Sequence, residues 1–531
     1  MTATVEPKTT IAVPASERRT PVAWWELVAV GLAMVVVAAL GVAAIRRGAP
    51  LRWDEAVYSL RALELLGATD LGQYWISVRA PGLPLMLTPM ALLVGATDVA
   101  FRTTCLVLAV AGVAVTWLIT RLLAGAGAAA LAAWLLVLAP GWLDSSWQVM
   151  PDIPGATLTL AAMAVILLAA RGDRLGWWAL AAAPLAFAAT LIRYGAPLLI
   201  GPAVVAALAL RWPAVRARPW RAVATLVGTA VGAAVVWFIP AVTRSPRPPV
   251  LIFTDRQDAK AIPATESAAD FFASLATVTG PVFGTLVVIG IVLAVVAAWR
   301  HPALRGPVVA SALVTLSVLA LLLVGIAEYH LRYLAPALPF LAILAAIGIA
   351  DLPSWNTRPA AWVTLGVIGA VVGLAGLIHT ARVTLHSVDE LSRVAGNRRA
   401  AYVHIAETTE RPCVMLNRSP TAGWYSGCTL KRPVSIRHGV AELAETARAD
   451  DPLWMVLRRG DTSFPLRGRE TDAGAHAAWL RRTAAEVTDV TPATAALRMG
   501  TVAEFDAALG QRDNTLRRLP PTGRWVPPGR S

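Results

Sequence analysis

The sequence predicts an α-helical polytopic membrane protein that carries a smaller, water-exposed α/β domain at its C-terminus. Of its 531 residues, 56% are hydrophobic and only 15% are charged. The mean hydropathy is +0.60, which is far from the balance of a soluble globular domain. Apolar runs long enough to cross a bilayer core, which takes about 20 residues as a helix, recur from Trp24 to Thr380 and then stop.

The first apolar run sets the N-terminal end of the membrane part. Residues 1–23 are polar and precede an apolar run from about Trp24 to Ile45. This run is longer than the roughly 7–15-residue core of a signal peptide. We therefore expect a cytoplasmic N-terminal tail over residues 1–23 and an uncleaved first membrane helix.

Further candidate spans follow the first helix and bring the expected total to about eleven. They lie at roughly residues 100–120, 126–143, 154–170, 175–192, 195–210, 222–241, 282–299, 307–327, 334–350 and 360–380. Every loop that this count places on the inner side contains arginine, as the positive-inside rule requires. The predicted membrane domain covers residues 24–380.

One apolar segment, from Gly82 to Gly95, tests this topology. It is short and contains Pro84 and Pro89. Counting it as a full crossing would place the basic cluster at 211–221 on the outer side, against the positive-inside rule. We therefore expect an interfacial or re-entrant helix within the first outer loop. The segments predicted to face outward are 46–99, 143–154, 243–281, 328–333 and the C-terminal domain.

Residues 381–531 are expected to form an extracytoplasmic α/β domain. They are charged and interrupted by prolines, with strand-like runs at 414–416 and 453–457. Cys413 and Cys428 lie in this domain, where oxidising conditions favour a disulfide bond. Their spacing fits a bridged hairpin, and two unpaired thiols are the alternative. A zinc site would need further ligands nearby.

The formal net charge of +14 raises nucleic acid as a partner, but the positions of the charges argue against it. Many of the arginines lie in short loops between apolar spans, so the charge is mostly topological. It also suits a protein that works against anionic lipid head groups. The sequence shows no zinc-finger or RNP-type motif, and no nucleic-acid partner is expected.

Three carboxylates lie at boundaries that are predicted to face outward. Asp54 and Glu55 follow the first helix, and Asp152 lies in the second outer loop, where it opens the next helix. Each could simply begin a helix, because acidic side chains favour the first turn and aspartate is a frequent N-cap. Their common face favours the alternative, in which they converge on one cleft as catalytic residues.

Basic side chains form the second part of the candidate site. Four of them map to the outer ends of apolar spans: Arg79, Arg193, His330 and Arg332. Any one arginine here could snorkel to a lipid head group, but a group of them beside carboxylates suits phosphate, which pairs well with guanidinium. The tyrosines of the same segments are expected to line the site: Tyr58, Tyr194 and Tyr333.

Taken in order along the chain, these features resemble the GT-C transferases that use polyprenyl-phosphate sugars, including protein O-mannosyltransferases and lipid A aminoarabinose transferases. The resemblance covers about residues 24–380. It rests on the Asp54-Glu55 pair, a basic-Pro-Pro-Gly-like turn at 79–84, Asp152, and the Arg-Tyr-Leu-Ala-Pro run at 332–336. The sequence departs from the family at Ala80, which replaces the first proline of that turn. It also lacks the large inserted exterior domain of eukaryotic protein mannosyltransferases.

The resemblance implies a bacterial cell-membrane glycosyltransferase that takes a hexosyl or pentosyl group from a polyprenyl-phosphate donor outside the cytoplasm. Asp54 would be the general base, supported by Glu55 and Asp152, while the basic residues would hold the lipid phosphate. The expected acceptor is a cell-envelope glycan or lipid, with a protein acceptor as the second choice. A divalent metal is a candidate cofactor because carboxylates are hard oxygen ligands, but arginines could do the same work.

Two functions of other classes compete with this prediction. A transporter or flippase would also be polytopic, but it tends to place ionisable groups near the bilayer midplane in pseudo-symmetric halves. Here the acidic residues lie at one boundary. A non-catalytic envelope scaffold would use its C-terminal domain to bind partners and would have no need for Asp54 and Asp152 together.

Overall fold

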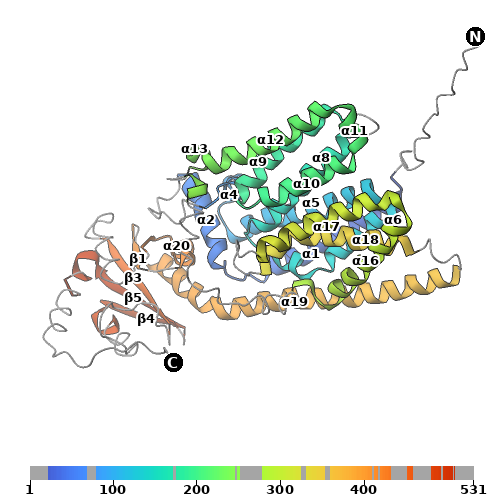
Figure 1. Ribbon diagram of the computed structural model, residues 1–531. Helices are drawn as coiled ribbons and strands as arrows, with labels where there is room; N and C mark the ends of the chain where they lie inside the picture. The colour runs from blue at the N-terminus through green and yellow to red at the C-terminus, as the bar shows by residue number, and fades with distance from the viewer. Residues whose placement is uncertain are drawn as a thin grey trace, which may run out of the picture.

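A computed structural model of the chain shows a bundle of helices joined to a small sheet domain by one long helix (Figure 1). The residues that the structure describes are 22–67, 79–170, 175–244, 248–251, 278–323, 331–352, 359–409, 412–416, 419–431, 451–458, 480–491, 494–505 and 507–508. The long helix, α19 (Pro359–Thr408), runs past the bundle and ends against the sheet. The expected domain boundary at residue 380 therefore falls inside a continuous helix.

Within the described residues, eight helices are long and apolar enough to cross a membrane, or nine if a bent pair counts as one span. The eight include α19 and the segment Leu334–Asp351, which joins η3 (Leu331–Ala337) to α18 (Leu338–Asp351). The others are α1 (Trp24–Arg46), α5 (Asp98–Ala124), α8 (Asp152–Ala169), α12 (Pro219–Phe238), α16 (Pro281–Arg300) and α17 (Pro302–Leu323).

The remaining predicted spans are also helical, but they are shorter or bent. The span expected at 126–143 is the bent pair α6 (Ala126–Val137) and α7 (Pro140–Ser146), which meet at 68°. Pro140 explains the break, because proline has no amide proton to continue the helix. The spans at 175–192 and 195–210 are η2 (Trp177–Ala181) with α9 (Ala182–Ile192), and α10 (Pro197–Leu210). The polytopic α-helical fold class is thus confirmed.

The segment predicted as an interfacial or re-entrant helix is α4 (Gly82–Val94), a helix of 13 residues. At about 1.5 Å per residue it spans roughly 20 Å, which is less than a bilayer core requires. The polar connections α11 (Trp212–Ala217) and α13 (Pro240–Thr243) flank α12.

The buried helix α18 lies at the centre of the bundle, where 78% of the segment Leu334–Asp351 is enclosed. Small residues let α16 approach it closely. A Cβ atom on Gly290 would lie 2.5 Å from the Ala345 Cα, and one on Gly348 would lie 2.1 Å from the Gly290 carbonyl oxygen. Close packing of small residues is the main way in which apolar helices associate in lipid.

The C-terminal domain is built on a five-stranded mixed sheet in the order β2-β1-β3-β5-β4. Strand β1 pairs in parallel with β2 and β3, and β5 pairs antiparallel with β3 and β4. The strands are β1 (Val414–Leu416), β2 (Thr429–Lys431), β3 (Pro452–Arg458), β4 (Glu486–Thr491) and β5 (Thr494–Thr501). The end of α19 packs Tyr402 and Ile405 against this sheet, so the predicted α/β domain is confirmed.

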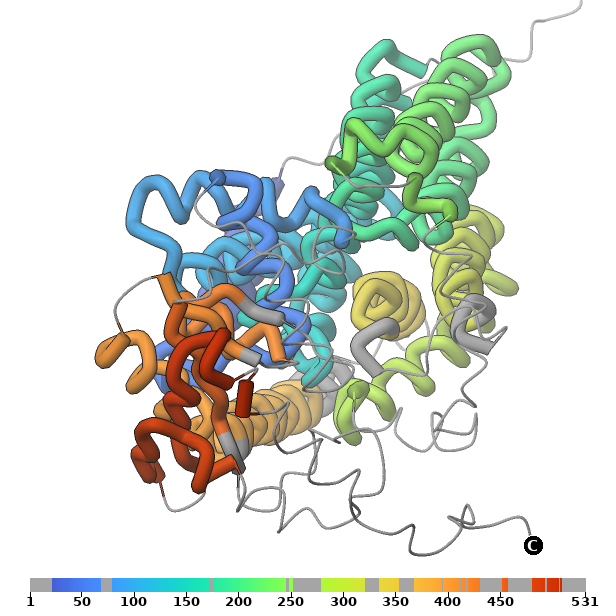
Figure 2. The backbone as a smooth tube through the Cα atoms, turned by 90° about the vertical axis from the view of Figure 1, so that its left-hand side faces the viewer, coloured from blue at the N-terminus to red at the C-terminus, as the bar shows by residue number. Residues whose placement is uncertain are grey.

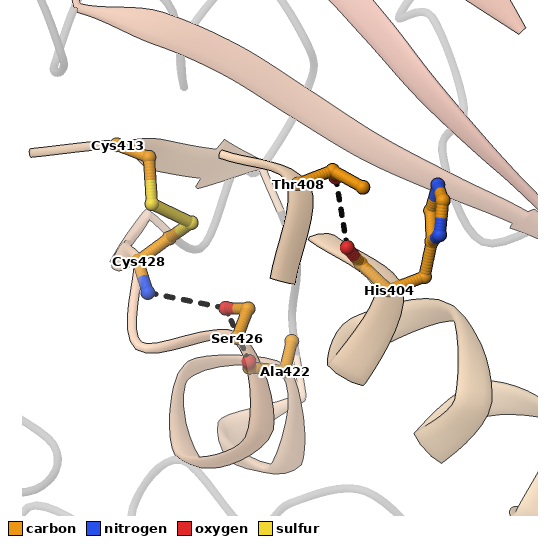
Figure 3. The surroundings of a disulfide bond; sticks show 6 residues. All are labelled: His404, Thr408, Cys413, Ala422, Ser426 and Cys428. Atoms are coloured by element: carbon orange, nitrogen blue, oxygen red, sulfur yellow. Dashed lines mark hydrogen bonds between the residues drawn. A yellow bond between two sulfur atoms is a disulfide. The ribbon is translucent and has the colours of Figure 1, made fainter. Parts of the chain in front are cut away.

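A disulfide bond joins Cys413 and Cys428, whose Cα atoms are 4.8 Å apart (Figure 3). The expected hairpin between them is wrong. The intervening chain forms the helix α20 (Pro420–Ser426), and the flanking strands β1 and β2 are parallel. Parallel strands cannot be joined by a tight turn and need a crossover, which α20 provides.

In protein purified without reductant, we expect Cys413 and Cys428 to resist alkylation until they are reduced. The bond closes a loop over a sequence separation of 15 residues, which stabilises the domain by about 3 kcal/mol in the chain-entropy model. Intact-mass measurement of alkylated protein, before and after reduction, tests this. Cys105, which is buried in the bundle, supplies the internal reference, and two reactive thiols in native protein would contradict the prediction.

Candidate active site

Asp54 lies in the first turn of α2 (Trp53–Leu65), directly after α1. Its carboxylate is 19% exposed, and Nη2 of Arg79 lies 3.4 Å from its Oδ1. The Arg79 guanidinium also lies 5.7 Å from the centroid of the Trp53 ring. The N-cap position belongs to Arg52 rather than to Asp54, so Asp54 does not cap the helix. It is a partly accessible carboxylate beside a partly accessible guanidinium.

Glu55, the next residue, is completely buried. Its Oε2 accepts hydrogen bonds from the Arg52 amide at 2.8 Å and from Arg102 Nη2 at 3.2 Å. Its Oε1 accepts from the Val149 amide at 2.9 Å and from Arg102 Nε at 3.3 Å. Glu55 therefore ties α2 to α5 and to the chain that leads to Asp152. This geometry gives it a positioning role rather than contact with a substrate.

Arg102, the partner of Glu55, was not singled out from the sequence because it lies inside the apolar span expected at 100–120. It is 1% exposed, donates to the carbonyl oxygens of Ala49 and Pro50, and stacks 4.8 Å from the Trp147 ring centroid. A charged residue inside an apolar span is costly and is normally paired or functional. That rule, applied to the start of α5, is the signal that could have identified it.

Asp152 is the first residue of α8, and its side chain is only 4% exposed. It forms an ion pair with Nη1 of Arg193, which follows the end of α9 in extended backbone conformation. The N-cap of α8 is Pro151, so Asp152 does not cap its helix either. A buried carboxylate at this place holds the guanidinium of Arg193 in a fixed orientation.

Gly82 brings the two ion pairs to the same end of the bundle. A Cβ atom at this position would lie 2.4 Å from both the Ile192 amide nitrogen and the Leu191 carbonyl carbon. Only glycine allows α4 to begin directly against the segment that carries Arg193. The glycine of the turn at 79–84 is thus required by close packing of the two basic segments.

A second polar cluster lies beside the first, around Asp144 at the end of α7, and the sequence reasoning missed this residue as well. Asp144 accepts hydrogen bonds from Gln148 at 2.9 Å and from Ser387 of α19 at 2.7 Å. Its Oδ2 also lies 3.9 Å from Nη2 of Arg52, the N-cap of α2. The cluster links the long helix to the start of the helix that carries Asp54.

Comparison with known proteins shows which family and which solved structures this chain is similar to. Residues 78–240, which include Arg79, Asp152 and Arg193, match the family described as dolichyl-phosphate-mannose-protein mannosyltransferase. The structure is similar to that of ArnT from Cupriavidus metallidurans bound to undecaprenyl phosphate. The TM-score is 0.59 at 17% identity, with 89% of this chain and 97% of that chain covered.

Two further solved structures show the same similarity. The apo state of the same ArnT gives a TM-score of 0.59 at 15% identity, covering 91% of this chain and 98% of that chain. The apo oligosaccharyltransferase of Archaeoglobus fulgidus gives 0.50 at 11% identity, covering 82% and 70%. The chain is a membrane protein with the GT-C glycosyltransferase fold. A search of curated proteins by sequence finds no match.

The predicted site residues differ in how far the structure places them. His330 lies outside the described residues, and only the backbone of Arg332 and Tyr333 is described, within η3. Tyr58 lies on the buried face of α2, in an apolar cluster with Leu51 and Leu83. Tyr194 is half-buried, and its carbonyl oxygen accepts a hydrogen bond from Trp237 of α12.

The C-terminal domain contacts the helix that carries Asp54 (Figure 2). Trp424 of α20 packs against Val57 and Leu60 of α2, and its indole nitrogen donates to Oδ1 of Asp98. The Tyr425 hydroxyl donates to Oδ2 of Asp98 at 2.6 Å. Burial, followed by the nearby Asp98 carboxylate, raises the pKa of Tyr425 above its usual range, so the hydroxyl keeps the proton that it donates.

Metal ligation has no visible candidate in the described part of the chain, where no three His, Cys, Asp or Glu side chains lie together. The carboxylates expected as hard ligands lie instead against arginines: Asp54 against Arg79, and Asp152 against Arg193. Each of these guanidinium groups belongs to a type of side chain that pairs well with phosphate oxygens.

Proposed function

We propose that the chain moves a sugar from a polyprenyl-phosphate-linked donor to a cell-envelope glycan or lipid acceptor on the extracytoplasmic face of the membrane. The observation that carries the proposal is the contact between Asp54 and Arg79 at the start of α2. It puts a carboxylate that could act as a base beside a guanidinium that could bind phosphate, and each side chain is 19% exposed. Transfer of a sugar from a phosphate needs both groups at the same reacting carbon.

In the proposed reaction, Asp54 accepts the proton of an acceptor hydroxyl as that oxygen attacks the anomeric carbon of the donor. The bond from the anomeric carbon to the phosphate oxygen breaks, and its electron pair leaves with the polyprenyl phosphate. Arg193 stabilises the charge that develops on this leaving group, and Arg79 binds the phosphate of the donor. Because phosphate leaves as a stabilised anion, no general acid is required.

The two arginines differ in how firmly they are held. Arg193 pairs with Asp152, a carboxylate that is only 4% exposed, whereas the Asp54 carboxylate beside Arg79 is more accessible. We therefore assign Arg193 to a fixed phosphate contact. Arg79 exchanges part of its contact with Asp54 for the donor phosphate, which leaves the carboxylate available as a base.

The known proteins similar to this chain support a lipid-linked donor. The Cupriavidus ArnT structure contains undecaprenyl phosphate, and the matched family is described by a dolichyl-phosphate-linked sugar. Both are polyprenyl phosphates. They share the chemistry that the paired guanidinium groups would recognise, an anionic phosphate on an apolar chain.

A protein acceptor is the second candidate, and the family match over residues 78–240 favours it, because that family is described as acting on protein. A transporter or flippase fits the arrangement less well. The charged pairs described here lie at helix starts and helix ends rather than in the middle of the spans, whereas transporters bind near the bilayer midplane.

Incubating the purified full-length protein with a panel of radiolabelled polyprenyl-phosphate sugars tests the proposal. We expect label to move to an envelope-lipid or glycan fraction, or to a peptide acceptor under the second candidate. Release or transport of intact donor across proteoliposomes, with no transfer in the presence of any acceptor, would show that the protein is a transporter.

Replacing Arg79 with alanine should raise the KM for the donor by roughly 10–100-fold, because a hydrogen bond to a charged group contributes about 1.5–3 kcal/mol. Saturating donor should then restore much of the rate. Arg47→Ala is the matched control, since Arg47 forms an exposed ion pair with Asp389 at 2.6 Å. An unchanged donor KM in Arg79→Ala would remove Arg79 from the phosphate site.

A further inference from the structure

Exposed tryptophans gather at the end of the bundle opposite to α2. In the described part of the chain, seven of the eight exposed tryptophans lie there: Trp24, Trp25, Trp177, Trp178, Trp212, Trp220 and Trp299. The helices α1, η2, α11 and α12 begin at this end, and α16 finishes there. Figure 1 shows α11 far from α2 and from the sheet domain. Tryptophan concentrates at this level of a membrane protein because its ring suits the boundary between lipid and water.

The same end carries an excess of positive charge. Seven arginines of the described chain lie there: Arg121, Arg211, Arg216, Arg218, Arg221, Arg300 and Arg305. The two described carboxylates at this end of the bundle each lie beside a basic side chain. Glu26 is paired with Arg121 at 2.7 Å, and Asp351 lies 3.4 Å from Nε2 of His301. The surface therefore complements an anionic ligand.

Arg221 is held in a specific geometry within this surface. Its guanidinium carbon lies 4.9 Å from the ring centroid of Trp177 and 5.0 Å from that of Trp220. The two rings meet edge to face with centroids 4.8 Å apart. The Arg221 Nη1 donates to the Leu175 carbonyl oxygen at 2.8 Å. Two aromatic rings and one carbonyl thus fix the plane of the guanidinium, whereas a snorkelling side chain would be free to move.

An apolar stripe runs along α12 on the face that carries Trp220, three residues before its first valine. Arg221 reaches this face through its contact with the Trp220 ring. Val223, Val227 and Val231 are 57%, 55% and 53% exposed. Their spacing of four residues places them on one face of the helix. The stripe leads away from Arg221 toward the middle of the bundle, in the direction that an acyl chain takes from its head group.

We propose that Arg221, Trp177 and Trp220 bind the phosphate of an anionic phospholipid, with an acyl chain along the valine stripe of α12. Guanidinium is the side chain best suited to phosphate oxygens, and the excess of arginine selects an anionic head group over a zwitterionic one. The site is separate from that of the donor. Helix α12 has 20 residues and is about 30 Å long at 1.5 Å per residue, so the two phosphates lie at opposite ends of the bundle.

Native mass spectrometry of the full-length protein, with phosphatidylglycerol or phosphatidylcholine added at equal concentration, tests the proposal. We expect wild type to retain phosphatidylglycerol preferentially, and Arg221→Gln to retain about fivefold less of it. Arg47→Gln is the matched control, because Arg47 follows the end of α1 at the opposite end of the bundle and forms an exposed ion pair with Asp389. It should retain phosphatidylglycerol as wild type does.

Equal retention of the two lipids by wild type, or undiminished phosphatidylglycerol on Arg221→Gln, would overturn the proposal. If Arg221→Gln does not fold, Trp220→Leu serves instead, because it leaves the bond from Arg221 to Leu175 in place. Unchanged retention by that variant would count equally against the site. Inorganic phosphate should not displace the lipid. If it did, the site would bind phosphate alone.

Discussion

Replacing Asp54 with asparagine should lower the rate of sugar transfer by about 10²–10⁴-fold, the usual effect of removing a positioned general base. Asparagine has nearly the same volume and can still accept a hydrogen bond from Arg79, so the start of α2 should stay in place. It cannot accept a proton from the acceptor. We therefore expect the loss in kcat, with little change in the KM for the donor, measured with saturating labelled donor and acceptor.

The control for Asp54→Asn is the same substitution at Asp389, which is 60% exposed and paired with Arg47. Surface ion pairs of this kind contribute little to stability, so Asp389→Asn should transfer sugar at the wild-type rate. Near-normal turnover of Asp54→Asn with a verified donor would show that Asp54 serves only the first turn of α2. Asp54→Asn should lower kcat, whereas Arg79→Ala should raise the donor KM. This difference separates proton transfer from phosphate binding.

Glu55→Gln should destabilise the protein by about 3–5 kcal/mol, the range observed when one member of a buried ion pair is removed. The substitution leaves the Arg102 guanidinium, which is 1% exposed, without its counter-charge. The glutamine side chain would also place its NH₂ group against the backbone amide of either Arg52 or Val149. That backbone amide would then lose its hydrogen-bond acceptor. Denaturant or thermal unfolding in detergent measures the effect. Activity should fall with stability, because α2 loses its attachment.

Glu390→Gln is the matched control, since Glu390 is exposed on α19 and its neutralisation should leave the unfolding midpoint unchanged. The double variant Glu55→Gln/Arg102→Met should recover part of the lost stability, because replacing both members of a buried pair is far less costly than removing one. Wild-type stability of Glu55→Gln alone would show that the pair does not hold α2.

The two adjacent carboxylates show where sequence reasoning stops. Asp54 and Glu55 are neighbours of the same charge at the same boundary, and both were predicted to be catalytic, Asp54 as the general base and Glu55 as a supporting carboxylate. The structure separates them because consecutive residues of a helix point about 100° apart. One carboxylate turns toward Arg79 and the other into the bundle, toward Arg102.

The exterior domain shows a similar division. The runs 414–416 and 453–457 were recognisable as strands, and oxidising surroundings favour the pairing of Cys413 with Cys428. The direction of β2 depends on the strand it pairs with rather than on its own residues. The structure therefore has a parallel crossover through α20 where the sequence predicted a hairpin. The contact of Trp424 and Tyr425 with Asp98 likewise joins residues more than 300 positions apart.

By itself, the sequence determined the membrane class, the approximate positions of the helical spans, the C-terminal α/β domain and the carboxylates and arginines that stand at helix ends. These features follow from local properties, because the length of an apolar run and the charge of a loop can be read from one segment alone. Only the tertiary structure decided which arginine pairs with which carboxylate, that Glu55 is buried on Arg102, and that α20 rests on α2. Those contacts depend on how separate helices pack, and packing is set by the whole bundle rather than by any one segment.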